Sequence, residues 1–145
     1  MKSGYLFVET HAARPGLVRL VLSDESPDPA PWAHSDRRIR YIARFNDREA
    51  GLMHVHEILK RRLVDPDAHL YRVPPEQAVA AVESLNIRHR QVYLDVDFGD
   101  DARAGIARYR EQFRANRRRM DQLFQTLGYL GLGLLLLNML VLSAL

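Results

Sequence analysis

The chain has 145 residues, which is enough for one domain and an appendage. It contains no cysteine, and this excludes disulfide frameworks, thiolate metal sites and cysteine nucleophiles. The net charge of +3 is unevenly distributed, because residues 101–145 have a balance of +4 and residues 1–100 a balance of −1. A basic pI that comes from one short segment is poor support for a nucleic-acid-binding face on the domain.

The first part of the chain has the composition of strands and turns. Gly4–Glu9 and Leu17–Ser23 predict two strands joined by the turn-forming sequence HAARPG. Asp24–Asp36 contains three prolines and predicts a loop. Over residues 39–45, apolar residues alternate mainly with arginine, which predicts a third strand with one buried and one mostly solvated face.

Two helical segments follow. Asn46 or Asp47 can cap a helix whose apolar face runs from Leu52 to Leu63. The sequence VDPDAH interrupts the pattern after that helix, and Pro75 opens a second helix.

Two further strands complete the domain. Leu70–Val73 predicts a short strand, and the alternation over residues 92–98 predicts the last one. The order β-β-β-α-β-α-β predicts a small α+β domain over residues 1–99, with an antiparallel sheet and two helices.

The end of the chain differs in composition from the rest. Residues 100–123 predict an Arg-rich helical stem that continues into a transmembrane helix over residues 124–145. Leu127–Leu145 has no charge and ten leucines, and nineteen helical residues span about 28 Å, close to the thickness of a bilayer core. The alternative, a buried core helix, needs more surrounding protein than a chain of this size offers.

Charge predicts the orientation of this span. Seven arginines precede it and no charged side chain follows it, so the positive-inside rule places the N-terminal domain in the cytoplasm. We therefore expect a single-pass, tail-anchored protein of a membrane, with the inner membrane of a bacterium as the working expectation. The membrane-proximal basic residues are Arg114, Arg117, Arg118 and Arg119.

An apolar seam with alternating steps of three and four residues runs along the stem and into the span. Such a stripe needs something to lie against: a second copy, a neighbouring subunit, its own domain or the bilayer surface. Asn138, at mid-span, is either a hydrogen-bonding contact to another membrane helix or a tolerated passenger. The other predicted contact residues are Ile106, Tyr109, Phe113, Met120, Leu127 and Leu134.

Two stretches carry a resemblance to a known family. GYLFVETHAARPGLVRLVLSDESP resembles the paired-strand opening of the GIY-YIG nuclease superfamily in its phage-type branch, where Gly-Tyr-Val-Tyr-Val precedes Pro-Gly-Leu-Val-Lys-Ile-Gly. VHEILKRRLVDPDAHLYRVPPEQAVAAV resembles the later segment of that branch, a His-Glu helix followed by a Phe-Phe-Arg-Val strand and an Ala-rich helix. The resemblance covers Gly4 to about Val82.

The resemblance implies phosphodiester cleavage by a tyrosine, an arginine and a metal-binding glutamate, but this chain departs from that set. The tyrosine position falls on Phe7, which has no hydroxyl, and the glycine of the second motif becomes Val21. The glutamate becomes Leu52, which cannot hold Mg²⁺, and a further acidic position becomes His69.

The helix that carries the family's arginine is shortened to the Pro-rich loop. Arg37 or Arg38 is a stand-in, and Tyr5 is a substitute for the tyrosine if the register is off by two. If the domain is active, Tyr5 and Arg38 are therefore the candidate catalytic residues. Otherwise we expect a pseudoenzyme that keeps the fold without the activity.

Histidine and aspartate clusters offer weaker signals. His54 and His56 are two residues apart on a predicted helix and point about 200° apart, so they do not share one metal ion, and His56 is expected to pack and hydrogen bond. Asp95 and Asp97 share one strand face, which indicates either a cation site or, with better odds, a solvated strand edge. We expect no cofactor and no metal.

Three arginines, Arg38, Arg40 and Arg44, share one predicted strand face. They indicate either contact with phosphate or an acidic partner, or an ordinary exposed face.

From these patterns we expect a non-catalytic accessory or scaffold subunit that docks its domain onto a larger membrane complex, such as an energy-converting one. Its partners are the lipid bilayer, other membrane-protein subunits and, as one option, a second copy; nucleic acid is not expected. The alternative is a membrane-tethered GIY-YIG-type nuclease or a nucleic-acid-binding protein.

Overall fold

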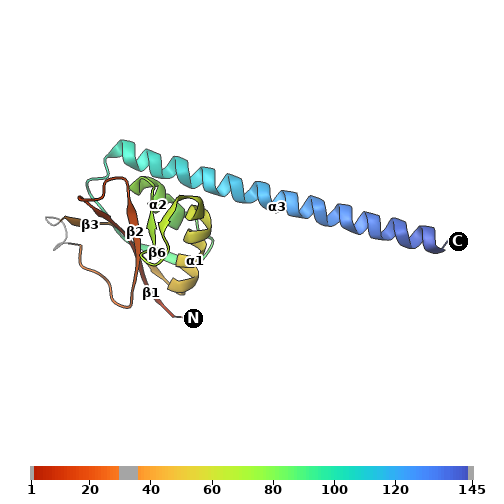
Figure 1. Ribbon diagram of the computed structural model, residues 1–145, viewed down its shortest axis with the longest axis horizontal. Helices are drawn as coiled ribbons and strands as arrows, with labels where there is room; N and C mark the ends of the chain where they lie inside the picture. Colours follow the sequence, from red (N-terminus) through yellow and green to blue (C-terminus); the bar gives the residue numbers. More distant parts are fainter. Residues whose placement is uncertain (1, 30–35, 144–145) are drawn as a thin grey trace. The chain divides into compact units, whose positions relative to one another are not determined.

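A computed structural model describes residues 2–29 and 36–143 of the chain (Figure 1). Residues 30–35 of the predicted Pro-rich loop and residues 144–145 of the predicted span lie outside the described residues. The chain divides into two compact units, Met1–Glu111 and Gln112–Leu145. The first unit contains the sheet, two helices and the first turns of the long helix.

The elements follow one another in the order expected, with one strand more. The strands are β1 (Gly4–His11), β2 (Val18–Ser23), β3 (Arg37–Phe45), β4 (Leu63–Asp65), β5 (Leu70–Tyr71) and β6 (His89–Leu94), and the helices are α1 (Arg48–Leu59), the 3₁₀ turn η2 (Lys60–Arg62), α2 (Pro75–Glu83) and α3 (Asp100–Ser143).

The described strands form one sheet of six in the order β4-β5-β2-β1-β3-β6, with every neighbouring pair antiparallel. This confirms the α+β prediction with an antiparallel sheet and a long C-terminal helix. The strands β1 and β2 form the expected hairpin, paired from Tyr5↔Ser23 to Thr10↔Val18.

Helices α1 and α2 cover one face of this sheet (Figure 1). Gly51 of α1 lies so close to the Phe45 ring of β3 that a Cβ atom there would be 2.9 Å from it, so glycine is required for this approach. Apolar side chains from the strands and the two helices fill the space between the layers. The buried members are Leu6, Val8, Val18, Leu20, Tyr41, Phe45, Val55, Leu59, Val79 and Val82.

The opposite face of the sheet carries a second, smaller apolar cluster. Phe7, Ile39 and Ile42 are its buried members, and partly buried hydrophobic residues pack against them. Side chains alternate between the two faces along β1, so Phe7 points away from the helices that contact its neighbours Leu6 and Val8.

Both predicted helix starts are confirmed. The Asp47 side chain caps α1 by accepting a hydrogen bond from the Ala50 N–H at 3.1 Å. Pro75 is the first residue of α2, where its missing N–H costs no hydrogen bond.

The prediction that α1 extends to Leu63 was wrong. The helix ends at Leu59 and η2 follows, after which Leu63 begins β4. The expected interruption VDPDAH contains the end of this strand and a turn, because the Asp65 carboxylate accepts the N–H groups of Asp67 and Ala68 at 3.0 and 3.1 Å. The turn sends the chain back as β5, which pairs with β4.

The prediction of a strand through residues 92–98 was also wrong. Strand β6 ends at Leu94, and Val96 is 78% exposed. The chain turns because the Asp95 carboxylate accepts the Asp97 N–H at 3.1 Å and the Asp95 carbonyl accepts the Phe98 N–H at 3.2 Å. Phe98 is buried, but it lies in this turn and is not part of a strand.

Candidate functional site

A hollow of about 380 Å³ lies at one end of the sheet, on the face opposite to α1 and α2. Four adjacent strands or their connections supply its lining. Its described lining residues are Glu9, Thr10, His11, Ala13, Arg14, Leu17, Arg19, Arg37 and Leu70. The volume lies in the range of small-ligand pockets.

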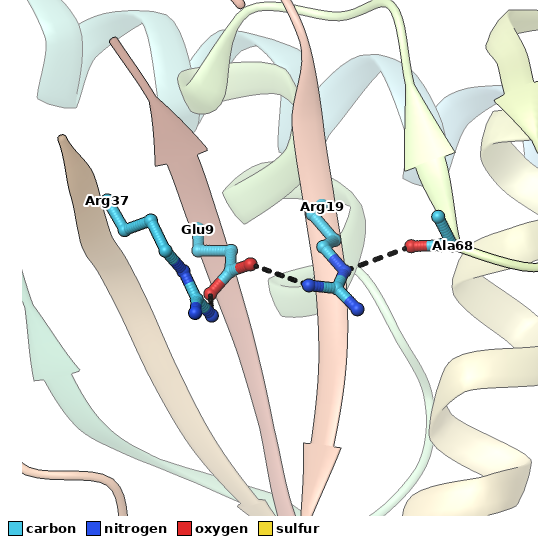
Figure 2. Close-up of polar contacts among 4 residues, drawn as sticks. All are labelled: Glu9, Arg19, Arg37 and Ala68. Atoms are coloured by element: carbon cyan, nitrogen blue, oxygen red, sulfur yellow. Dashed lines mark hydrogen bonds and ion pairs between the residues drawn. The ribbon is translucent and has the colours of Figure 1, made fainter. Parts of the chain in front are cut away.

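Glu9 is the buried centre of this hollow, with only 6% of its surface exposed. Figure 2 shows its carboxylate between two guanidinium groups, with Arg37 Nη2 donating to Oε2 at 2.9 Å and Arg19 Nη1 donating to Oε1 at 3.3 Å. A buried carboxylate without such partners would be strongly destabilising. The antiparallel register places Arg19 directly across from Glu9, and Arg37 comes from the start of β3 on the other side.

Arg19 is held at a second point. Its Nε donates to the Ala68 carbonyl in the β4–β5 turn at 3.3 Å (Figure 2). The guanidinium is thus fixed by two acceptors while 46% of the side chain stays exposed. Its Nη2 group has no partner among residues 2–29 and 36–143, so donors remain for a ligand.

His11 adds a defined donor to the same hollow. Its Nδ1 accepts the Ala13 N–H at 3.1 Å, and an accepting Nδ1 puts the proton of a neutral ring on Nε2. The turn that follows is closed by the Leu17 N–H bonded to the Arg14 carbonyl, and Gly16 takes the positive φ of 77° that the turn requires.

A second buried carboxylate, Asp95, has no exposed surface. Arg38 Nη2 donates to Asp95 Oδ1 at 2.8 Å, and this bond raises the pKa of the Arg38 guanidinium above its usual value. Arg38 Nε and Arg40 Nη1 lie 2.7 and 2.9 Å from Oδ2 as ion pairs whose N–H groups do not point at that oxygen. Arg38 also pairs with Asp97, and Arg40 stacks 4.5 Å from the centre of the Phe98 ring.

These contacts decide between the alternatives that the sequence left open for Asp95 and for three arginines of β3. Asp95 belongs to neither a cation site nor a solvated strand edge, because two arginines neutralise it. Of the three arginines predicted on one strand face, only Arg44 is exposed, whereas Arg38 and Arg40 hold the Asp95–Gly99 turn.

Tyr5 and Arg38, the candidate catalytic pair, are not brought together. Tyr5 lies across from Arg44 and Arg38 across from Thr10, so five residues of β1, or about 17 Å, separate them. The residues in line with Tyr5 on the next two strands are Arg44 and Arg90.

The two positions that the resemblance aligned with acidic residues, Leu52 and His69, lie at another place. Together with His56 they line a hollow of about 250 Å³ beside α1. As expected, His56 is a hydrogen-bonded packing residue, with Nδ1 3.0 Å from the hydroxyl of buried Tyr71. Across the described part of the chain, no three histidine or acidic side chains are grouped to hold a metal ion.

The predicted contact residues of the stem divide into two sets. Ile106 is buried in the first unit, where Arg110 Nη1 of α3 also donates to Glu83 of α2 at 3.1 Å. Part of the seam therefore lies against the chain's own domain. Tyr109 and Phe113 are half-buried. The exposed set comprises Met120, Leu127, Leu134 and Asn138, together with the basic residues Arg114, Arg117, Arg118 and Arg119.

Helix α3 is long and apolar enough to cross a membrane, and its apolar window has no residue buried against protein. The described residues after Asp121 carry no charged side chain through Ser143. These 22 helical residues span about 33 Å, slightly more than a bilayer core.

The sequence matches no protein-family model, and no curated protein or solved structure is significantly similar to it. Fold and site are therefore interpreted from this chain's own residues.

The hollow around Glu9 was not predicted from the sequence. The contact between Glu9 and Arg19 could have been predicted, because the hairpin β1–β2 places these two residues opposite each other. The contact with Arg37 could not, since Arg37 follows a loop whose path the sequence does not specify.

Proposed function

We propose that this chain is a single-pass membrane protein whose α+β domain works at the cytoplasmic surface as a non-catalytic accessory or scaffold subunit of a larger membrane assembly. One observation carries the proposal. Helix α3 is a single uninterrupted helix that packs onto the domain through Ile106 and Arg110, passes through an Arg-rich stretch and continues after Asp121 as an uncharged, leucine-rich segment.

The apolar segment supports a membrane location because its side chains have no protein to lie against. Leu127, Leu130 and Leu134 are each more than half exposed. Exposure of a continuous apolar surface of this length to water is energetically unfavourable. The seven arginines on the N-terminal side of the segment favour a cytoplasmic domain.

The placement of the candidate catalytic residues supports a non-catalytic role. Tyr5 is separated from Arg38, Arg38 is committed to a buried carboxylate, and Leu52 stands where the GIY-YIG superfamily has its metal-binding glutamate. We infer that the domain is a degenerate relative of that superfamily.

Fractionation and protease protection test the membrane part of this proposal. We expect the full chain to resist extraction by alkaline carbonate, and we expect Leu134→Arg/Leu135→Arg to release it. Protease added to inside-out vesicles should digest the domain, whereas protease added to intact cells should not. Equal extraction of the two chains contradicts the anchor, and digestion in intact cells contradicts the orientation.

Purification in mild detergent tests the scaffold role. We expect the chain to co-migrate with other membrane subunits, and we expect that association to survive Tyr5→Phe. A Mg²⁺-dependent DNA cleavage activity of the full chain that disappears in Tyr5→Phe would contradict the non-catalytic role. Migration as a free monomer would contradict the scaffold role.

Nucleic-acid binding is the second candidate function, and a basic surface at the other end of the sheet favours it. Arg44, Arg88 and Arg90 surround a hollow of about 470 Å³ that also includes His89, and Tyr5 lies in line with two of them. Arginines beside an aromatic ring suit a single strand. Binding through this surface should weaken steeply with salt and with Arg44→Gln/Arg90→Gln.

A further inference from the structure

We propose that the hollow around Glu9 is a binding site for a phosphate monoester whose organic part is apolar. This proposal concerns the domain alone and does not depend on how α3 meets a membrane. Three properties of the hollow carry it: its charge, the fixed position of its donors and its apolar wall.

The charge of the lining matches a phosphate monoester. Three arginines and one glutamate give a formal balance of +2, and a phosphate monoester carries close to two negative charges at neutral pH. Glu9 does not reverse this formal balance, because its carboxylate contributes one negative charge against three positive ones. Its carboxylate instead holds Arg19 and Arg37 on either side of the hollow.

The donors are organised before a ligand arrives. Arg19 is tied to Glu9 and to the Ala68 carbonyl, so a phosphate oxygen meets a guanidinium whose orientation is already fixed. His11 offers its Nε2 hydrogen because its Nδ1 is occupied by the Ala13 N–H. Arg14, on the connecting turn, is exposed at the rim and completes a set of donors from three segments.

The apolar wall selects for the organic part of the ligand. Leu17 and Leu70 are the leucines of the described lining, and Leu70 is the direct cross-strand neighbour of Arg19 in the β2–β5 pairing. Inorganic phosphate would fill only the charged part, so an ester with an aromatic or aliphatic body should bind more tightly than phosphate itself.

The same chemistry occurs in a soluble phosphate ester and in the headgroup of phosphatidic acid. Both present a terminal phosphate on a less polar body. The experiment therefore needs one arm for each source.

In the first arm, phenyl phosphate is titrated into the full chain in uncharged detergent micelles, and binding is measured by isothermal titration calorimetry. We expect saturable binding that Arg19→Gln weakens by about tenfold, because a charge-assisted bond is lost. Glu9→Gln should bind about threefold more tightly, because it removes the only negative charge among the described lining residues while it keeps an acceptor for the arginines. Arg61→Gln, which changes an exposed arginine that lines neither this hollow nor the one around Arg44, should have no effect.

Opposite effects of Arg19→Gln and Glu9→Gln separate a ligand site from a purely structural ion pair. Loss of binding in Arg44→Gln in place of Arg19→Gln would place the ligand at the other end of the sheet and overturn the proposal. A wild-type chain that binds neither phenyl phosphate nor phosphatidic acid would overturn it as well. If Arg19→Gln does not unfold cooperatively, Arg14→Gln replaces it, since this exposed turn residue has no role in the sheet. We expect it to weaken binding by about threefold.

The second arm replaces phenyl phosphate with micelles that contain phosphatidic acid. Arg19-dependent binding in this arm alone assigns the site to a lipid headgroup, and Arg19-dependent binding of phenyl phosphate assigns it to a soluble ester. Binding that is independent of Arg19 in both arms would overturn the proposal.

Discussion

Two carboxylates in this domain are each held by two arginines, and the difference between them is instructive. Asp95 is fully buried, and its partners Arg38 and Arg40 are 31% and 17% exposed. Glu9 is almost as buried, but its partners Arg19 and Arg37 keep 46% and 42% of their side chains exposed. The same pairing of charges therefore closes a turn at one place and lines an accessible hollow at the other.

The largest effect should come from Asp95→Ala. This change leaves two arginines facing a buried gap, and we expect it to lower the free energy of unfolding by about 3 kcal/mol. Denaturant unfolding of the full chain in detergent, followed by far-UV circular dichroism, gives the measurement. Asp97→Ala is the matched control, because its carboxylate is largely exposed and should cost less than about 1 kcal/mol.

Hydrogen exchange locates that loss. The Asp95–Gly99 turn precedes α3, so Asp95→Ala should reduce amide protection in the first turns of α3 more than in the β1–β2 hairpin. Equal loss of protection in the two segments would contradict a local role for the Asp95 cluster.

Arg38→Lys should have an intermediate effect. A lysine keeps the charge but cannot supply two nitrogen atoms to Asp95, and we expect a loss of about 1–2 kcal/mol in the same unfolding assay. The corresponding Arg37→Lys at Glu9 should cost clearly less, since a partly exposed pair is screened by water. Similar losses in both variants would remove the distinction between the two clusters.

Glu9→Gln should destabilise the domain by only about 1 kcal/mol. The amide keeps one of the two acceptor oxygens, and the arginines remain solvated on their outer side. The difference between Glu9→Gln and wild type should also shrink in 1 M salt, whereas the effect of Asp95→Ala should not. A salt-independent loss of about 3 kcal/mol would show that Glu9 has the same structural role as Asp95.

The smallest effect is expected at a buried polar group that has no partner. The Tyr41 hydroxyl makes no hydrogen bond within the described residues, and burial, with the nearby charge of Glu83, raises the pKa of Tyr41. Tyr41→Phe should therefore change the stability at pH 7 by no more than about 1 kcal/mol, and removal of an unpaired hydroxyl favours a gain.

The pH dependence of Tyr41 has a definite sign. The unfolded chain loses the tyrosine proton near pH 10, whereas the folded domain keeps it at higher pH. Stability should therefore fall as the pH rises above about 10, and Tyr41→Phe should make that fall shallower. Unfolding curves between pH 8 and pH 11 check this, and identical slopes in the two proteins would contradict it.

Much of the fold could be predicted from local patterns. The β1–β2 hairpin, the Asp47 cap, the helix at Pro75 and the long apolar helix depend on residues close in sequence. The predicted strand ends were wrong where contacts between residues distant in sequence determine the structure. A bulge between Ile42 and Ala43 breaks the simple register of β3 with β6, and the last strand ends where Asp95 turns inward.

The sites were harder to predict than the fold for the same reason. Arg38 and Asp95 are 57 residues apart, and Glu9 and Arg37 are 28 apart. Sequence spacing cannot indicate that an arginine is already paired with such a distant acid. The sequence consequently indicates a cation site or a solvated strand edge at Asp95. For Arg38 and Arg40 it leaves open a contact with phosphate or an acidic partner and an exposed face.

The ends of the sheet have a consequence if α3 holds copies of this protein close together in a membrane. One outer strand, β4, has only three residues, and the other, β6, is irregular and carries an exposed Arg90. Neither is a good template for backbone pairing with a neighbouring chain. Copies crowded together in two dimensions would thus be protected from joining their sheets into fibres.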